Sequence, residues 1–138
     1  QILALIAAHD VLEGDITLTP GEGELLPETY SFTRGQTRDG VIADMMTARN
    51  AVVDELWEKR ANDLPIMTKD EAVILASIVE KETGVAGERP LIAAVFVNRL
   101  RRGMRLQSDP TIIYGLTGGE PLGRGLRKSE LERATPYN

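Results

Sequence analysis

The spacing of apolar and polar residues divides the chain into helices joined by loops rich in glycine and proline. Apolar residues recur at intervals of three and four in four segments, namely 1–12, 37–62, 68–83 and 88–102. A short extended stretch is predicted between the first two of these helices, and beyond residue 103 the pattern becomes irregular. The fold class predicted is therefore mainly α, or α+β with a few short strands.

The predicted helix ends carry recognisable signals. Thr68 and Glu71 have the spacing of a capping box, in which each side chain accepts a hydrogen bond from the other residue's backbone. Gly84 and Gly103 follow the last apolar residues of two helices, where glycine commonly ends a helix. Pro90 falls in the first turn of its helix, where proline is tolerated.

Glu82 departs from the pattern of its helix. With residues 71–83 projected at about 100° per residue, Glu82 falls only about 20° from Leu75, inside the apolar arc. Glu80 falls about 140° from Leu75 on the polar side, so it is expected to be solvated. The sequence LASIVEKETG thus places one of its two glutamates among apolar residues.

A carboxylate in that position has three plausible arrangements. It can extend past the helix end into water, or it can be buried and paired with Arg89, Arg99 or Arg105. It can also lie at the floor of a cleft, where loss of water favours the protonated form near neutral pH. The third arrangement is the one that a general acid for glycosidic cleavage needs.

Length and composition narrow the class of protein. With 138 residues, 42% of them apolar, the chain is large enough for one compact domain. A net charge of −5 argues against a nucleic-acid partner, because a binding face would need to be basic. The absence of cysteine excludes a disulfide scaffold, and the single histidine, His9, excludes an HExxH zinc motif.

Three segments carry a resemblance to a known family. They are ASIVEKETG, ERPLIAAVFVNRLRRGMRLQSDPTIIYG and TPYN, supported upstream by EGELLPETYSF. Together they resemble the endolytic murein transglycosylases of bacteria (the MltG or YceG-like family, earlier labelled aminodeoxychorismate lyases). The resemblance implies a lysozyme-like catalytic domain, an enzyme that cleaves the MurNAc–GlcNAc β-1,4 bond of peptidoglycan, and products with 1,6-anhydro-MurNAc ends.

The resemblance also implies roles for single residues. The family's catalytic glutamate matches Glu82, which would act first as an acid and then as a base. By a looser likeness to lysozyme-like transglycosylases, Gln107 in LQSDPT and Tyr137-Asn138 in TPYN match positions that bind substrate. No cofactor and no metal is implied.

Three further residues are candidates for contact with substrate. Asp109 is either a second carboxylate of the site or a residue that shapes the turn before Pro110. Glu28 either lines a groove or anchors its own loop. Tyr114, like Tyr137, offers either a face for a sugar ring or a buried ring with a satisfied hydroxyl.

The chain is expected to be a piece of a longer protein. Residues 1–138 would form a catalytic domain fragment without an N-terminal membrane anchor, a LysM-like region and the end of the domain. No run of 18 apolar residues occurs, so no segment of it is expected to span a bilayer. The full-length protein would lie on the outer face of the cytoplasmic membrane, with glycan strands as substrate and peptidoglycan synthases as candidate partners.

Two other functions compete with this interpretation. A non-catalytic glycan-binding or scaffold domain would hold Glu82 ionised in a salt bridge. A pyridoxal-phosphate lyase would need a Schiff-base lysine and a phosphate cradle. The chain's lysines are all expected at the surface, so this second alternative is rejected.

Overall fold

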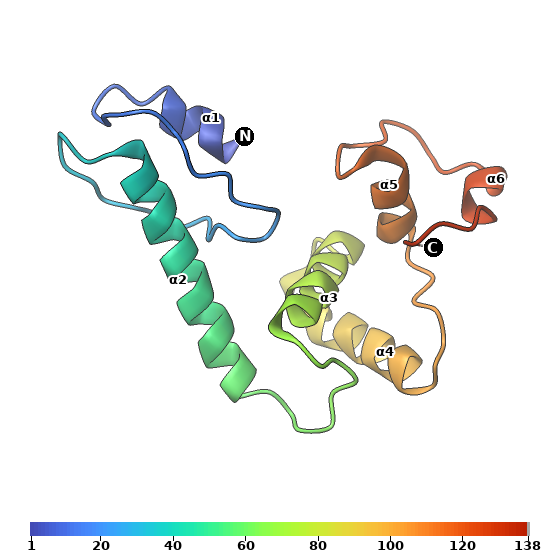
Figure 1. Ribbon diagram of the computed structural model, residues 1–138. Coiled ribbons are helices and arrows are strands. Elements are labelled where there is room, and N and C mark those ends of the chain that lie inside the picture. Colours follow the sequence, from blue (N-terminus) through green and yellow to red (C-terminus); the bar gives the residue numbers. More distant parts are fainter. Residues whose placement is uncertain (138) are drawn as a thin grey trace. The chain divides into compact units, whose positions relative to one another are not determined.

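Figure 1 shows the computed structural model, which describes residues 1–137 and divides into two compact units, Gln1–Arg60 and Ala61–Asn138. The elements in chain order are α1 (Ile2–Ala7), α2 (Arg38–Glu58), α3 (Lys69–Glu82), the short 3-10 helix η1 (Ala86–Glu88), α4 (Arg89–Arg101), α5 (Asp109–Thr117) and α6 (Lys128–Leu131). The fold is mainly α, as the pattern predicts. The chain forms two compact units, and the prediction of one domain stays a prediction.

The expected short strands are not formed. Within residues 1–137 the strand-like pairing is an isolated parallel bridge between Glu13 and Thr37. Two backbone bonds make it, from the Glu13 amide to the Gln36 carbonyl and from the Arg38 amide to the Glu13 carbonyl, both 3.0 Å long. Side chains at the start of α2 supply further hydrogen bonds to the loop of 8–37.

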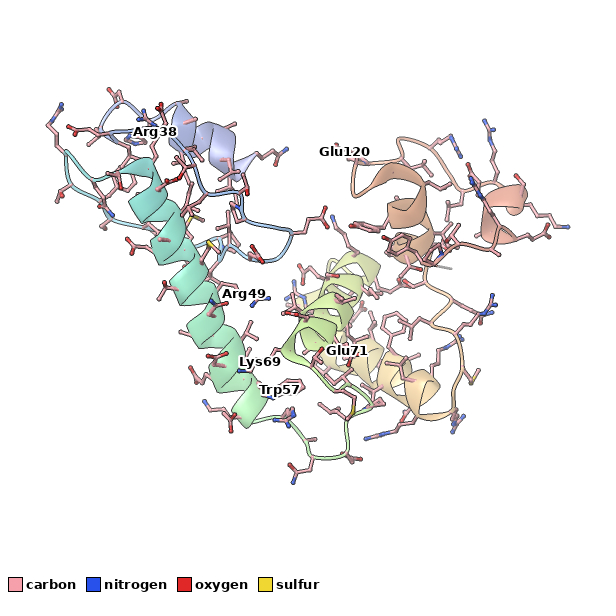
Figure 2. All side chains as sticks on the ribbon, viewed as in Figure 1. Arg38, Arg49, Trp57, Lys69, Glu71 and Glu120 are labelled. Atoms are coloured by element: carbon pink, nitrogen blue, oxygen red, sulfur yellow. The ribbon has the colours of Figure 1, made fainter. Side chains whose placement is uncertain are left out.

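Arg38, at the start of α2, fastens the segment that follows α1 (Figure 2). Its guanidinium donates to the carbonyls of Ala7 at 3.3 Å, His9 at 3.0 Å and Gly14 at 2.8 Å. α1 ends at Ala7 rather than at residue 12, and the carbonyls of Ala7 and His9 bind Arg38 there. The chain then turns and buries Leu12.

Asp39 fastens the next part of the same loop. Its carboxylate accepts from the backbone amides of Thr17 and Leu18, at 2.9 and 3.1 Å, and from the Thr17 hydroxyl. These hydrogen bonds, that from the Thr17 hydroxyl first, lower the pKa of Asp39 below its ordinary value. The first turn of α2 therefore orders a loop that has no sheet to pair with.

The core of the N-terminal unit lies between α1, this loop and one face of α2 (Figure 1). Its buried residues are Ile6, Leu12, Val41, Ile42 and Met45. The helix ends at Glu58, four residues before the predicted end, and the Arg60 guanidinium then lies 3.9 Å from the centre of the Trp57 ring. A cation over an indole face is a favourable contact that does not require the helix to continue.

In the C-terminal unit, α3 packs against both α4 and α5. The predicted capping box is formed, because Thr68 accepts from the Glu71 amide at 3.1 Å and the Glu71 carboxylate accepts from the Thr68 amide. Val79, Phe96 and Ile112 are the buried apolar residues, one from each of the three helices. Among residues 1–137, no helix combines the length and apolar character needed to cross a bilayer.

The short helix α6 depends on one carboxylate. Glu130 accepts from the Arg127 amide at 2.8 Å and from both terminal nitrogens of Arg124, at 2.9 and 2.5 Å. These bonds, that from Arg124 above all, lower the pKa of Glu130 from 4.5 to about 2. The ionised carboxylate thus links the loop before α6 to its first turn.

Ile42→Ala is expected to lower the free energy of unfolding of the N-terminal unit by about 2–5 kcal/mol, because Ile42 is fully buried and its removal leaves a cavity. Val52→Ala, at an exposed site on the same helix, should change it by less than about 1 kcal/mol. Urea unfolding followed by the fluorescence of Trp57, the only tryptophan, measures both. Equal effects would contradict the assignment of the core.

The hydrogen bonds of Glu130 are expected to persist far below the usual pH for a carboxyl group. Since its pKa is depressed in the folded chain, the stabilisation is present above pH 4.5 and is lost as the pH falls through about 2. The Arg127 amide shift in an NMR titration follows this change. Arg124→Gln should move the midpoint upward, and a wild-type midpoint near 4.5 would contradict the pairing.

Candidate active site

Glu82 is the last residue of α3. After it the backbone of Thr83 becomes extended, with φ −141° and ψ 140°, so the helix ends without a left-handed glycine at Gly84. Glu82 is exposed. This exposure matches the first of the three arrangements, in which the carboxyl group extends past the helix end, and not the enclosed one that a general acid needs. The helical projection places Glu82 in the apolar arc, but its position in the last turn of α3 lets the side chain extend past the helix end.

The segment that follows Glu82 is tied down locally. The Thr83 hydroxyl donates to the Glu88 carboxylate at 2.6 Å and accepts from the Val85 amide at 3.0 Å. These two bonds join the end of α3 to the start of α4. The hydroxyl residue after Glu82 therefore fixes the path of the chain at the site.

The other glutamate of the motif has the guanidinium partner. Arg89 donates from Nη2 to Oε1 of Glu80 at 2.8 Å, and its Nε lies 2.7 Å from Oε2. Glu80 was expected to be solvated, and it is exposed but paired. Arg99, a candidate partner for Glu82, binds Gln107 and the Arg105 carbonyl instead.

Ser108 is the partner of Glu82 that the sequence interpretation missed. Its hydroxyl donates to Oε2 of Glu82 at 2.8 Å, although Ser108 itself is only 1% exposed. Ser108 is the N-cap of α5. A serine before Asp-Pro is a signal for a helix start, but nothing in the sequence indicates that its hydroxyl faces α3.

Gln107, a predicted substrate contact, lies directly before Ser108 and takes a left-handed backbone conformation with φ 54°. This conformation costs about 1–2 kcal/mol for a residue with a side chain. Arg99 holds it, since Nη1 donates to Oε1 of Gln107 at 2.8 Å and to the Arg105 carbonyl at 3.0 Å. Gln107 is exposed and adjacent in sequence to the residue that binds Glu82.

Asp109 is the first residue of α5. A carboxylate in the first turn is favoured by the positive end of the helix dipole, so the position fits the turn-shaping alternative. Its side chain is exposed. The structure thus places Glu82, Gln107, Ser108 and Asp109 around one junction between α3 and α5.

The two candidate tyrosines lie together. The rings of Tyr114 on α5 and Tyr137 in the C-terminal segment are 5.0 Å apart in an edge-to-face arrangement. The Tyr137 amide donates to the Thr135 hydroxyl at 3.2 Å, and a Cβ atom on Gly115 would lie 3.3 Å from the Tyr137 ring. The close fit to a residue without a side chain seats the TPY segment on α5. The remaining candidate, Asn138, lies outside the described residues.

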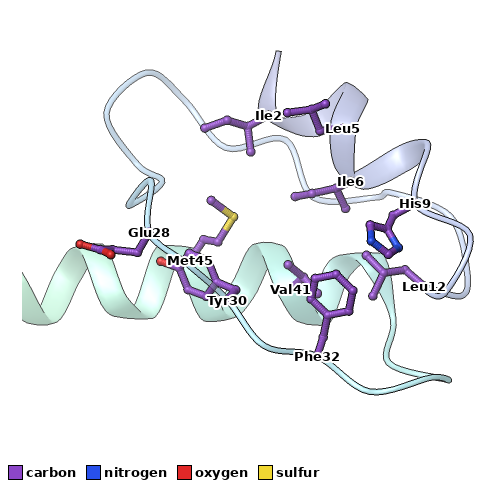
Figure 3. Close-up of a pocket in the computed structure, with 10 residues that line it drawn as sticks. All are labelled: Ile2, Leu5, Ile6, His9, Leu12, Glu28, Tyr30, Phe32, Val41 and Met45. Carbon is purple, nitrogen blue, oxygen red and sulfur yellow. The ribbon is translucent and has the colours of Figure 1, made fainter.

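Glu28 belongs to the N-terminal unit. There it lines an open, mainly apolar pocket of about 220 Å³ (Figure 3). The Tyr30 hydroxyl near it donates to the Leu26 carbonyl at 2.9 Å, and the His9 ring meets the Phe32 ring edge-to-face at 4.8 Å. Glu28 itself is exposed at this pocket, and its two alternatives stay predictions.

Glu82 is an exposed carboxyl group whose hydrogen-bond partner on α5 is a neutral hydroxyl. Such a group can exchange a proton with a ligand, whereas the Glu80 carboxylate is committed to a cation. Across residues 1–137, no cluster of three His, Cys, Asp or Glu side chains is arranged to hold a metal ion.

Comparison with known proteins places this arrangement in a family. The chain is 36% identical over 121 residues to an endolytic murein transglycosylase of Bacillus subtilis, an alignment of 86% of this chain and 32% of that protein. It is 39% identical over 95 residues to an endolytic murein transglycosylase of Streptococcus pneumoniae, covering 67% of this chain and 16% of that protein. The chain thus spans about a third or less of these relatives. The YceG-like family matches over residues 1–138, and the chain belongs to this family.

Proposed function

We propose that this chain carries the catalytic acid of a lytic transglycosylase that cleaves the MurNAc–GlcNAc bond in peptidoglycan glycan strands. The names of the two relatives support this substrate and reaction class. The observation that carries the proposal is the environment of Glu82, an exposed carboxyl group at a helix end whose hydrogen-bond partner is a hydroxyl. A lysozyme-like arrangement of the complete domain is part of the same proposal.

The reaction needs one carboxyl group that acts twice. Protonated Glu82 donates to the leaving glycosidic oxygen while positive charge develops on the MurNAc ring. The ionised carboxylate then accepts the proton of the substrate's own C6 hydroxyl as that oxygen attacks C1. Because the nucleophile belongs to the substrate, the second step gains the advantage of an intramolecular reaction and no water is consumed.

Because Glu82 is exposed, a bound substrate would have to supply part of the apolar environment of its carboxyl group. A glycan strand bound over the α3–α5 junction would displace water from the carboxyl group, which favours the neutral acid. The Tyr114–Tyr137 pair and the Gln107 amide, both on or next to α5, are the groups offered to sugar rings and N-acetyl groups.

A glycan-binding domain without catalysis is the second candidate. The exposure of Glu82 favours it to the extent that an exposed carboxylate can bind sugar hydroxyls without transferring a proton. This alternative required Glu82 to be locked in a salt bridge, and the bond to Ser108 is not one. The experiment below separates the two functions.

We also propose that the full-length protein works at the outer face of the cytoplasmic membrane, beside peptidoglycan synthases. The support for this placement is the substrate, since glycan strands are assembled there. Localisation of a fluorescent fusion in living cells tests it, and a cytoplasmic signal would contradict it.

Glu82→Gln is expected to abolish cleavage of purified glycan strands by the full-length protein, with a loss of at least about 100-fold. Glutamine keeps the shape of the side chain and can still accept from Ser108, so the loss reports the missing proton. Glu80→Gln is the matched control in the same motif and should keep activity within about threefold. Mass spectrometry of the products reads the outcome.

The product masses distinguish the alternatives. Ends lighter by one water indicate the anhydro sugar and support the proposal, whereas reducing ends indicate hydrolysis. A wild-type protein that binds strands without cleaving them would favour the scaffold function. Equal loss in the two variants would contradict the role of Glu82.

A further inference from the structure

Ser108 has a side chain in an unusual arrangement for its position. It caps the N-terminus of α5, yet its side chain makes no capping bond. A serine at this position ordinarily accepts from a backbone amide of the first turn. Here the hydroxyl of a residue that is 1% exposed is directed instead at the last residue of another helix, Glu82.

From this geometry we infer that Ser108 is a positioning residue that decides which oxygen of Glu82 carries the proton. The inference rests on the proposed function. Because Oε2 accepts from the Ser108 hydroxyl, this hydrogen bond favours Oε1 as the oxygen that carries the proton of the neutral acid. Oε1 is then the atom that faces the ligand.

The proton movements balance at this one atom. The O–H bond at Oε1 breaks as its proton passes to the glycosidic oxygen and the bond from C1 to that oxygen breaks. The C6 hydroxyl then gives its proton to Oε1 as its oxygen bonds to C1. Through both steps the Ser108 hydroxyl keeps Oε2 occupied, so the carboxyl group ends in its starting state.

The backbone of Ser108 is held on both sides. Its carbonyl accepts from the amide of Thr111 at 3.1 Å and from the hydroxyl of Thr111 at 2.8 Å. On the other side Arg99 fixes the left-handed turn at Gln107. Because the backbone is already ordered, little conformational entropy is lost when the Ser108 hydroxyl bonds to Glu82.

Three charged groups on the neighbouring elements are engaged elsewhere. Glu80 is paired with Arg89, Glu88 accepts from Thr83, and Arg99 binds Gln107. Asp109 occupies the first turn of α5. The hydrogen bond from Ser108 is thus the contact of the Glu82 carboxylate on which the inference rests.

The kinetic test uses the full-length protein on purified glycan strands. Ser108→Ala is expected to lower kcat about 10- to 100-fold with KM within about twofold, as for loss of a hydrogen bond to a charged group. Ser108→Thr keeps the hydroxyl and should recover most of the rate. Ser77→Ala is the matched control, because the Ser77 hydroxyl donates to the Ile74 carbonyl of its own helix.

A second pair of variants tests the support of the turn. Arg99→Met removes the guanidinium that holds Gln107 and should lower kcat about 3- to 10-fold. Arg101→Met is its control on the same helix, because Arg101 binds Asp63 instead. Equal rates for these two variants would overturn the part assigned to Arg99.

A measurement without substrate keeps this inference separate from the proposed function. Hydrogen exchange of the α5 amides in Glu82→Ala, Ser108→Ala and the double variant forms a thermodynamic cycle. The hydrogen bond predicts a coupling of about three- to tenfold in the protection factors. Absence of coupling, or a Ser108→Ala enzyme with wild-type kcat, overturns the inference.

The two measurements fail in different ways. If the exchange cycle shows coupling but the wild type cleaves nothing, the hydrogen bond between Ser108 and Glu82 is confirmed. The proposed function is then refuted, and with it the catalytic part given to Ser108. Cleavage that depends on Glu82 but not on Ser108 would refute this inference alone.

Discussion

The reversal of the backbone at Gln107 is the constraint on which the candidate site depends. A residue with a side chain enters the left-handed region there, and the Arg99 guanidinium holds it by binding both the Gln107 amide oxygen and the Arg105 carbonyl. This turn sets the residue at which α5 begins. The start of α5 in turn brings a buried serine to the end of α3. The position of the Glu82 carboxylate thus depends on the turn at Gln107, which precedes Ser108 in the chain.

In the N-terminal unit, charged side chains also bond to the backbone of an irregular segment. A loop without strands exposes backbone groups that need partners. Arg38 and Asp39, adjacent residues of the first turn of α2, supply donors to three carbonyls and acceptors to two amides. In both units, charged side chains on a helix order the irregular chain beside it.

The sequence predicted local features well and tertiary ones poorly. The capping box of Thr68 and the stop at Gly103, where φ is 64°, depend on a few neighbouring residues and were found. The projection gave Glu82 its correct direction, but it carries no information on how far the packed part of α3 extends. The partner of Arg99 and the direction of the Ser108 hydroxyl depend on where α5 lies against α3. The spacing of residues along one helix carries no information about how α5 packs against α3.

Under the proposed function, the exposed end of α3 has a consequence for the length of glycan strand that is cleaved. A carboxyl group in contact with water obtains an apolar environment from whatever covers it. Sugars far from the cleaved bond would then contribute to the rate through that cover, because binding energy remote from the reacting atoms is used at the transition state. Short oligosaccharides that occupy the α3–α5 junction but leave the Glu82 carboxyl group in contact with water would bind but would be cleaved slowly.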